Sequence, residues 1–358
     1  MIVNAKEVLG VSTVLEVKEL QTFFHLDEGI VKAVDGVSFT LERGKTLAIV
    51  GESGCGKTMT GFSIMQLVPK PGKIEGGEIW LNTPNGGRRN LLALAPESAE
   101  MHSIRGKDIA MIFQEPMASL SPVHTVGFQI IEAIQTHQAM SKNDARTLAI
   151  ELLGEVGIPD PAQRVDSYSY ELSGGMRQRA MIASALACDP AILIADEPTT
   201  AVDVTIQAQI LRLLRQLQRE KGTAIMLITH DLGVVASMAD DVVVMYLGGV
   251  VESGPVENIF AEPKHPYTVG LIRSTPVLGK GKISELETIK GSVPSPFEHV
   301  SGCRFHPRCD SFIPGKCDVG MPPLVWLTEE HSTACWLYEE LADSKATGQK
   351  LSKVGGEG

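Results

Sequence analysis

Short apolar runs, separated by segments of mixed polarity, are the clearest pattern along this chain. Four of them are five to seven residues long and consist mainly of Ile, Leu, Val, Ala and Met, a composition typical of buried strands. They cover residues 46–50, 108–113, 191–197 and 223–228. Segments with helical spacing of apolar residues lie between them, so the pattern predicts an α/β fold.

Two other patterns mark regions outside these runs. Residues 14–24 and 30–41 alternate well enough between apolar and polar positions to predict two strands. Residues 122–171 carry apolar side chains at helical spacing, and Ser141 with Asp144 three residues later matches a capping box. We therefore expect a mostly helical insert in this part of the chain.

A glycine-rich loop follows the first buried run, and we call residues 51–58 the phosphate loop. Its sequence is Gly51-Glu52-Ser53-Gly54-Cys55-Gly56-Lys57-Thr58. It matches G-x-x-x-x-G-K-[ST], in which backbone N–H groups and a helix N-terminus hold phosphate. Lys57 would reach the β- and γ-phosphates, and the Thr58 hydroxyl would bind Mg²⁺. The alternative is a glycine turn with a chance lysine, but the strand before the loop and the helix predicted after it favour nucleotide binding.

Cys55 lies inside the phosphate loop, beside Lys57 and near a helix N-terminus. Both neighbours predict a lowered pKa and a reactive thiol. We expect alkylation of Cys55 to block nucleotide hydrolysis and bound ATP to protect it. The alternative is a small residue that the loop merely tolerates.

Polar residues follow the other buried runs. Gln114 closes the second run and could touch Mg²⁺ and the attacking water, although a surface glutamine is the alternative. Asp196 and Glu197 close the third run; one carboxylate would hold Mg²⁺ and the other would orient or deprotonate a water, the alternative being a helix cap. His230 follows the fourth run and could reach the γ-phosphate, although a lone histidine is more often structural.

A second glycine-rich segment, Ser173-Gly174-Gly175, precedes another predicted helix. A serine and two glycines at a helix N-terminus form an anion-binding nest. Two phosphate sites in one chain are explained most simply by a head-to-tail dimer, in which this nest faces the partner's γ-phosphate. A plain helix cap is the alternative.

Composition narrows the choice of function. The chain has 358 residues, 43% of them hydrophobic, and a formal net charge of −11. This charge argues against a protein that coats nucleic acid. No run of about 18 apolar residues occurs, so nothing is expected to span a bilayer. Residues 1–10 lack the basic and apolar segments of a secretion signal.

Four of the six cysteines cluster near the end of the chain, at Cys303, Cys309, Cys317 and Cys335. Their spacing contains no C-x2-C pair, so it is not a standard zinc-finger pattern. Four thiolates suit either a [4Fe–4S] cluster or Zn²⁺, for which a nearby histidine could also be a ligand. Because the segment is rich in Pro and Gly and poor in periodic apolar residues, a metal would give it structure. Residues 340–358 are expected to be a flexible tail.

These motifs, in their order and spacing, resemble the ATP-binding subunit of ABC transporters over about residues 14–260. Met176, the segment 113–122, the segment 265–268 and the cysteine-bearing tail resemble the oligopeptide/dipeptide/nickel importer branch. The resemblance implies a P-loop NTPase (RecA-like) ABC nucleotide-binding domain with a helical subdomain and a small irregular Cys-rich C-terminal domain. The expected bounds are 1–262 for the ATPase domain, 117–172 for its helical subdomain and 263–339 for the C-terminal domain.

The resemblance also assigns roles. Lys57 and Thr58 hold phosphate and Mg²⁺, Asp196 holds Mg²⁺, Glu197 polarises the water and His230 senses the γ-phosphate. Ser173 and Gly175 act in trans, and Gln114 links nucleotide to the membrane subunits. Phe24 is the expected adenine-stacking aromatic, although the family more often has tyrosine there. Some members of the family have a [4Fe–4S] cluster in this tail, which favours iron–sulfur over Zn²⁺ or free thiols.

The function that the resemblance implies is ATP hydrolysis that energises import of peptides or related small solutes. The implied partners are a second, usually different, ABC ATPase subunit, two integral-membrane permease subunits and, indirectly, an extracytoplasmic solute-binding protein. The implied location is the cytoplasmic face of the cell membrane. The alternative is a non-transport ABC ATPase acting on nucleic acid or ribosomes. Such proteins usually carry two cassettes or a long coiled coil, and the acidic charge also disfavours this alternative.

Overall fold

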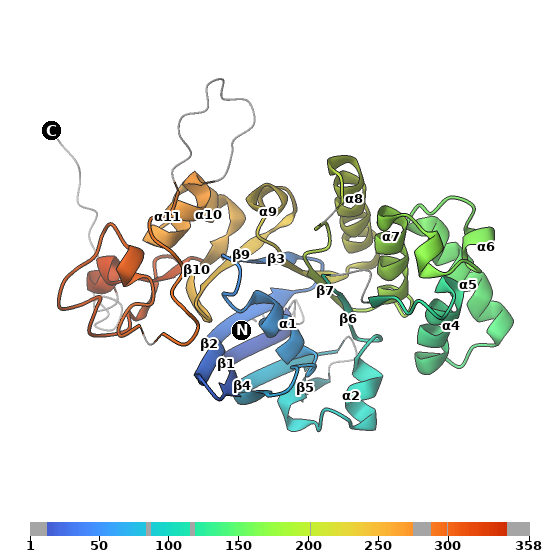
Figure 1. The fold of residues 1–358 in the computed structure, drawn as a ribbon, viewed down its shortest axis with the longest axis horizontal. Helices are drawn as coiled ribbons and strands as arrows, with labels where there is room; N and C mark the ends of the chain where they lie inside the picture. Colours follow the sequence, from blue (N-terminus) through green and yellow to red (C-terminus); the bar gives the residue numbers. More distant parts are fainter. Residues whose placement is uncertain are drawn as a thin grey trace, which may run out of the picture.

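The computed structural model describes most of the chain and contains two β-sheets with helices around them (Figure 1). The described residues are 13–83, 87–114, 119–200, 202–274, 288–298 and 300–341. The expected flexible tail therefore lies almost entirely outside the described residues. Among the described residues, no helix has the length and apolarity needed to cross a membrane.

The larger sheet has eight strands in the order β11-β12-β10-β9-β3-β8-β7-β6. Its strands are β3 (Thr46–Val50), β6 (Ile109–Ile112), β7 (Ile192–Asp196), β8 (Ala224–Ile228), β9 (Asp241–Tyr246), β10 (Gly249–Pro255), β11 (Leu324–Trp326) and β12 (Ser332–Ala334). The five strands from β9 to β6 are parallel to one another, whereas β10 pairs antiparallel with β9. Every residue of β3, β6, β7 and β8 is buried, which explains why these strands are apolar runs without alternation. The four predicted buried strands are confirmed.

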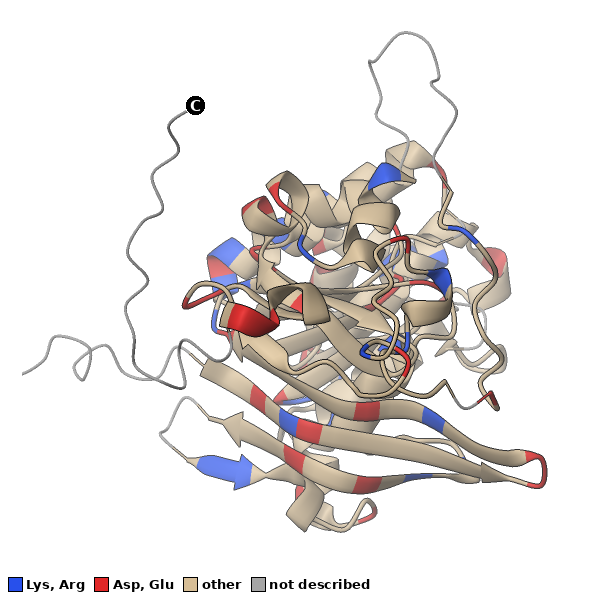
Figure 2. Ribbon diagram, turned by 90° about the vertical axis from the view of Figure 1, so that its left-hand side faces the viewer, with Lys and Arg blue, Asp and Glu red and all other residues tan. Residues whose placement is uncertain are grey.

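The smaller sheet is antiparallel and lies against the larger one. Its order is β2-β1-β4-β5, with β1 (Thr13–Leu26), β2 (Gly29–Glu42), β4 (Gly72–Asn82) and β5 (Arg88–Asn90). Apolar side chains of β1 and β2, such as Val17 and Val37, share one core cluster with Ile49 of β3. Most of the exposed positions of β1 and β2 are polar. Acidic and basic residues are mixed along the strands (Figure 2). This division explains the alternating sequence pattern and confirms the two predicted strands.

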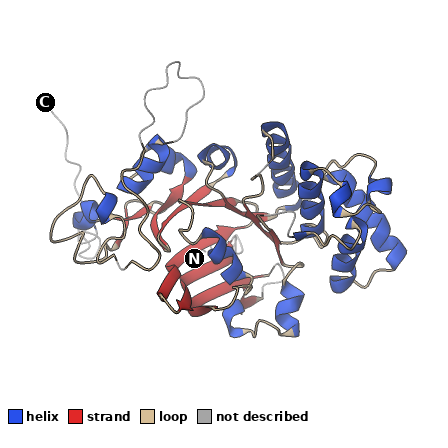
Figure 3. Ribbon diagram, viewed as in Figure 1, coloured by secondary structure: helices blue, strands red, loops and turns tan. Residues whose placement is uncertain are grey.

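Helices cover the larger sheet and form a separate lobe on the right of Figure 3. The helices of the lobe are α4 (Val126–His137), α5 (Lys142–Glu155), α6 (Pro161–Arg164) and α7 (Gly174–Ala185). Ser141 Oγ accepts the N–H of Asp144 at 3.2 Å, so the predicted cap begins α5. The predicted helical insert is confirmed. The other helices are α1 (Lys57–Ile64), α2 (Ala99–Ile104), α8 (Val204–Lys221), α9 (Leu232–Met238), α10 (Val256–Ala261) and α11 (Pro266–Arg273).

The described part of residues 263–341, here called the C-terminal region, is built onto the larger sheet. Strand β12 pairs with β10 and β11 pairs with β12, so this region supplies the last two strands of the sheet. Aromatic rings of Tyr246, Tyr267 and Phe305 pack together with centroid distances of 4.7 to 5.4 Å. A separate Cys-rich domain is therefore not confirmed, because the sheet and this aromatic core continue into it. The boundary at residue 262 stays a prediction.

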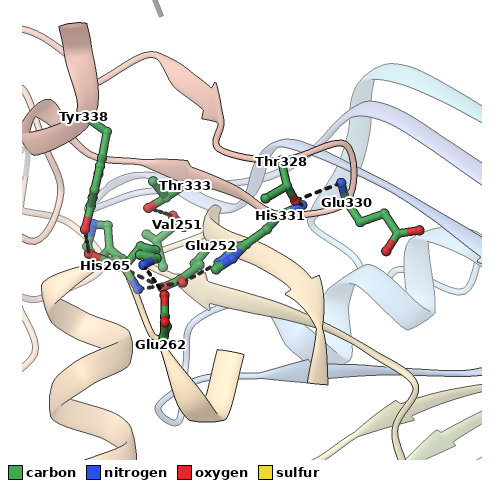
Figure 4. A network of polar contacts seen from close by, with 10 residues as sticks. Val251, Glu252, Glu262, His265, Thr328, Glu330, His331, Thr333 and Tyr338 are labelled. Carbon is green, nitrogen blue, oxygen red and sulfur yellow. Dashed lines mark hydrogen bonds and ion pairs between the residues drawn. The ribbon is translucent and has the colours of Figure 1, made fainter. Parts of the chain in front are cut away.

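A buried carboxylate fastens the C-terminal region to β10 (Figure 4). The side chain of Glu252 is fully buried and accepts the backbone N–H groups of Lys264 and His265, at 2.7 and 2.8 Å. It also accepts a hydrogen bond of 2.8 Å from Nε2 of His331, which is 3% exposed. Two segments of the C-terminal region, 264–265 and the one around His331, thus depend on one side chain as the acceptor for three donors.

We predict that Glu252→Ala destabilises the fold by about 3 kcal/mol, because it leaves two buried N–H groups and the His331 ring without an acceptor. Chemical unfolding followed by circular dichroism measures the change. Glu262→Ala is the matched control, because it removes an exposed pair with Lys264 that contributes little. An equal loss of unfolding free energy in the two variants would contradict the role of Glu252 as a stabilising buried acceptor.

Candidate nucleotide site

Backbone geometry requires glycine at the two ends of the phosphate loop. Gly51 and Gly56 have φ values of 153° and 102°, which L side chains rarely adopt. A Cβ on Gly51 would lie 2.3 Å from the carbonyl oxygen of Met245, and one on Gly56 would lie 2.0 Å from that of Ala33. Gly56 also begins α1 without a side-chain cap. The loop therefore presents backbone N–H groups at a helix N-terminus, the arrangement that binds phosphate.

Lys57 is folded back over this loop. Its side chain is buried, and Nζ donates hydrogen bonds to the carbonyl oxygens of Gly51 at 2.8 Å and Glu52 at 3.0 Å. The ammonium group is thus held among the backbone atoms of the phosphate loop. Next to it, Thr58 Oγ1 donates to Asp196 Oδ1 at 3.2 Å. The predicted phosphate loop and the predicted acidic strand end are therefore in contact.

Asp196 and Glu197 have different electrostatic surroundings. Asp196 is 1% exposed, and burial raises its pKa to about 6, although the hydrogen bond from Thr58 opposes this effect. Burial would also raise the pKa of Glu197, but the hydrogen bonds from His230 and Thr200, together with the charges of His230 and Lys57, lower it overall. The pKa values of these adjacent carboxyl groups are therefore shifted in opposite directions, a feature common at functional sites.

Three side chains hold the carboxylate of Glu197. Gln114 Nε2 and Thr200 Oγ1 donate to its Oε2 at 3.1 and 2.8 Å, and His230 Nδ1 donates to its Oε1 at 2.9 Å. Glu197 also has a φ of 45°, a strained value for a residue with a side chain. The His230 side chain is 63% exposed, so this cluster opens to solvent. The structure thus brings together the residues that close β6, β7 and β8.

The other predicted nucleotide contacts lie elsewhere on the chain. Ser173 is the N-cap of α7, where its Oγ accepts the N–H of Met176 at 3.3 Å. Ser173, Gly174 and Gly175 form the N-terminus of α7. Figure 1 shows α7 within the helical lobe and away from α1, so the structure does not bring this N-terminus to the phosphate loop of the same chain. Phe24 lies on β1, and its ring packs on Gly72, where an added Cβ would be 2.6 Å from Cε1.

The expectation of a lowered pKa for Cys55 is wrong, whereas the effect of its alkylation on hydrolysis stays a prediction. Its side chain is 3% exposed, and burial raises the pKa of the thiol even though Lys57 acts in the opposite direction. A buried, protonated thiol is a poor nucleophile. The sequence showed the neighbouring lysine but not the burial that outweighs it.

The prediction of a [4Fe–4S] cluster, with Zn²⁺ as its alternative, is also wrong. All four cysteines are free, and within the described ranges no group of three or more Cys, His, Asp or Glu side chains is arranged to hold a metal ion. Burial raises the pKa of Cys335 to about 11, and the charges of the neighbouring Cys303, Cys309 and Cys317 act in the same direction. Cys303 and Cys317 instead pack in the aromatic cluster of the C-terminal region.

Sequence reasoning missed two contacts of the phosphate loop with the C-terminal region. Arg308 donates to the carboxylate of Glu52, and Tyr267 Oη accepts the N–H of Glu52 at 2.8 Å. It also missed Thr200 as a partner of Glu197. Thr200 had a local signal, because it lies three residues after Glu197 at the start of a predicted helix. The partners of Glu52 had none, because more than 200 residues separate them from the loop.

Comparisons with known proteins agree with this geometry. The ABC transporter family model matches residues 34–200, and the model of the oligopeptide/dipeptide transporter C-terminal region matches residues 251–317. The chain is 51% identical over 330 residues to the Sinorhizobium fredii protein named "Probable peptide ABC transporter ATP-binding protein y4tR", covering 92% of this chain and 96% of that one. It is 49% identical over 330 residues to the oligopeptide transport ATP-binding protein AppD of Bacillus subtilis, covering 92% and 98%.

The solved structures point the same way. The dimeric structure of MJ0796, a bacterial ABC transporter cassette, matches with a TM-score of 0.60 and 27% identity, covering 68% of this chain and 98% of that one. A dimeric post-hydrolysis state of MJ0796 bound to ADP and Pi matches equally well. The predicted α/β P-loop fold is confirmed. The chain belongs to the family of ATP-binding subunits of peptide ABC transporters.

Proposed function

We propose that this chain hydrolyses ATP to energise import of peptides or related small solutes through an ABC transporter. The observation that carries the proposal is the carboxylate of Glu197, held by Gln114, Thr200 and His230 beside the phosphate loop. Relatives named as oligopeptide and dipeptide transport ATP-binding proteins support the cargo class. In this family, selectivity among cargoes lies in the binding protein and the membrane subunits.

Nucleotide binding is assigned to the phosphate loop and to Phe24. The N–H groups of residues 51–58 and Lys57 hold the phosphates, and the ring of Phe24 stacks on the adenine. Thr58 and Asp196 would hold Mg²⁺, since a small hard cation needs only one or two protein oxygens besides phosphate and water. When bound, the ion neutralises charge on the phosphates. Gln114 closes the neighbouring strand and is assigned to the same ion.

Hydrolysis is assigned to Glu197 as the group that orients and polarises the attacking water. Its lowered pKa keeps it ionised at neutral pH, as a hydrogen-bond acceptor for water must be. His230 holds this carboxylate in place and contacts the γ-phosphate. Positioning and charge stabilisation, rather than covalent chemistry, provide most of the acceleration in phosphoryl transfer to water.

The remaining assignments require other chains. Ser173, Gly174 and Gly175 lie far from their own phosphate loop, so they are assigned to the γ-phosphate bound by a second ABC ATPase subunit. The dimeric MJ0796 cassettes support this arrangement. The helical lobe is assigned to contacts with two integral-membrane permease subunits at the cytoplasmic face of the membrane, where a solute-binding protein delivers cargo from the other side. The alternative function on nucleic acid or ribosomes is not favoured, because the full-length relatives are transport proteins.

We predict that Glu197→Gln lowers ATP hydrolysis by about 100-fold or more while ATP binding persists, because a neutral amide cannot polarise the water. Hydrolysis is measured as phosphate release by the transporter complex, and retained ATP is measured after gel filtration. Glu220→Gln, an exposed position on α8, is the control and should leave both unchanged. Normal turnover by the Glu197 variant would refute the assignment.

A second prediction concerns the buried carboxyl group of Asp196. Its folded pKa of about 6 exceeds the unfolded value near 3.8, so its ionisation costs stability as pH rises through this window. Asp196→Asn should therefore raise the unfolding free energy of the Mg²⁺-free, nucleotide-free protein by roughly 2 kcal/mol at pH 8 but by only about 0.5 kcal/mol at pH 4. Urea unfolding at both pH values measures this. A gain that is equal at the two pH values would show that the carboxyl group is not destabilised by burial.

A further inference from the structure

One arginine of the C-terminal region reaches the phosphate loop. Arg308 Nη1 donates to Glu52 Oε2 at 2.7 Å, and Nη2 donates to Glu52 Oε1 at 3.1 Å. The Arg308 side chain is 5% exposed and that of Glu52 is 25% exposed, so the pair is largely shielded from solvent. Arg308 Nε also donates to the carbonyl oxygen of Lys290 at 3.0 Å, which fixes the guanidinium plane. Such a two-bond pair constrains orientation as well as distance.

A second residue of the C-terminal region holds the backbone of Glu52. Tyr267 is fully buried, and its Oη accepts the N–H of Glu52 at 2.8 Å. The N–H of Tyr267 in turn donates to Nδ1 of His265 at 3.0 Å, and the N–H of His265 donates to Glu252, in the network of Figure 4. The phosphate loop is thus connected through buried hydrogen bonds to the carboxylate that fastens the C-terminal region to the sheet.

Glu52 is also the residue on which Lys57 rests. Its carbonyl oxygen accepts the bond from Lys57 Nζ at 3.0 Å, while its N–H and its carboxylate are held by Tyr267 and Arg308. The contacts therefore fix the position of one of the two carbonyl groups that hold the lysine. A shift of Glu52 would move the lysine and the loop together.

Charge gives the pair a further consequence. A carboxylate within a loop that receives the phosphate groups of ATP would repel them, and the repulsion is strong where water is excluded. Arg308 places a cation directly on this carboxylate and offsets its charge. We propose that Arg308 is a positioning residue for nucleotide: it neutralises Glu52 and orders the phosphate loop, so that the C-terminal region sets the affinity for ATP. This inference rests on the proposed function of the loop.

The alternative is that Arg308 only attaches the C-terminal region to the rest of the protein and has no specific effect on nucleotide binding. Arg304 provides the matched control for this alternative. Four residues earlier in the same segment, Arg304 Nη2 donates to Asp35 Oδ2 at 2.6 Å and Nη1 donates to the carbonyl oxygen of Leu247 at 2.7 Å. It therefore attaches the region to β2 and to the turn after β9. This turn reaches the phosphate loop only through its backbone, where the N–H of Gly248 donates to the carbonyl oxygen of Cys55 at 3.0 Å, so Arg304 places no charge on the loop. Loss of attachment alone would affect both arginine variants alike.

The test compares Arg308→Gln, Arg304→Gln, Glu52→Gln and the double variant Glu52→Gln/Arg308→Gln in the transporter complex. Binding of a fluorescent ATP analogue gives Kd, and phosphate release gives kcat and KM for MgATP. We expect Arg308→Gln to raise Kd and KM by about tenfold while kcat changes by about twofold or less. Arg304→Gln should change Kd by less than about twofold. The double variant should recover Kd to within about threefold of the wild type, because the unneutralised carboxylate is gone.

Two outcomes would overturn the proposal: equal weakening by the two arginine variants, or a double variant that binds no better than Arg308→Gln. Thermal unfolding of each variant shows whether it is folded. If Arg308→Gln is not folded, Arg308→Lys replaces it, because lysine keeps the charge but loses the two-bond geometry. The proposal then requires that Arg308→Lys raises Kd by a smaller factor, and that combining it with Glu52→Gln removes this rise. Absence of hydrolysis by the wild type would refute the proposed function instead, because Kd is measured without turnover.

Discussion

The parallel register of β3, β8, β7 and β6 is the constraint on which the rest of the structure depends. Ile49 pairs with Ile228, Ile228 with Asp196, and Ala195 with Ile112, so the four strands end at one edge of the sheet. The first residues after these strands therefore meet, although long helical segments separate them in sequence. These four strands are buried on both faces, which excludes water and leaves polar side chains only at the strand ends.

The phosphate loop is held by two layers of contacts. The first is steric, since Gly51 and Gly56 approach the carbonyl groups of Met245 and Ala33 too closely for any side chain. The second is polar, through Tyr267 and Arg308 on Glu52. Backbone order before nucleotide arrives reduces the entropy lost on binding, so both layers favour affinity. These polar contacts come from the C-terminal region, so this region directly contacts the phosphate loop of the nucleotide site.

The C-terminal region shows how composition misled the sequence argument. Its many Pro and Gly residues and four cysteines indicated a segment that needs a metal to fold. The structure instead packs Cys303 and Cys317 with Tyr246, Tyr267 and Phe305, and adds two strands to the existing sheet. The core needed here was supplied mainly by residues outside the cysteine-bearing segment. A search for periodic apolar residues within the cysteine-bearing segment therefore could not detect this core.

Local patterns in the sequence determined the buried strands, the helical lobe, the phosphate loop and the family, because each depends on residues close together in the chain. They also placed Gln114, Asp196, Glu197 and His230 at strand ends. Tertiary structure alone decided which partners these side chains meet. Burial reversed the expected pKa shift of Cys55 and raised the pKa of Asp196, whereas the hydrogen bonds from His230 and Thr200 outweigh burial and lower the pKa of Glu197. Desolvation and long-range pairs such as Arg308 with Glu52 depend on which distant segments meet. The periodicity of apolar residues in the sequence does not contain this information.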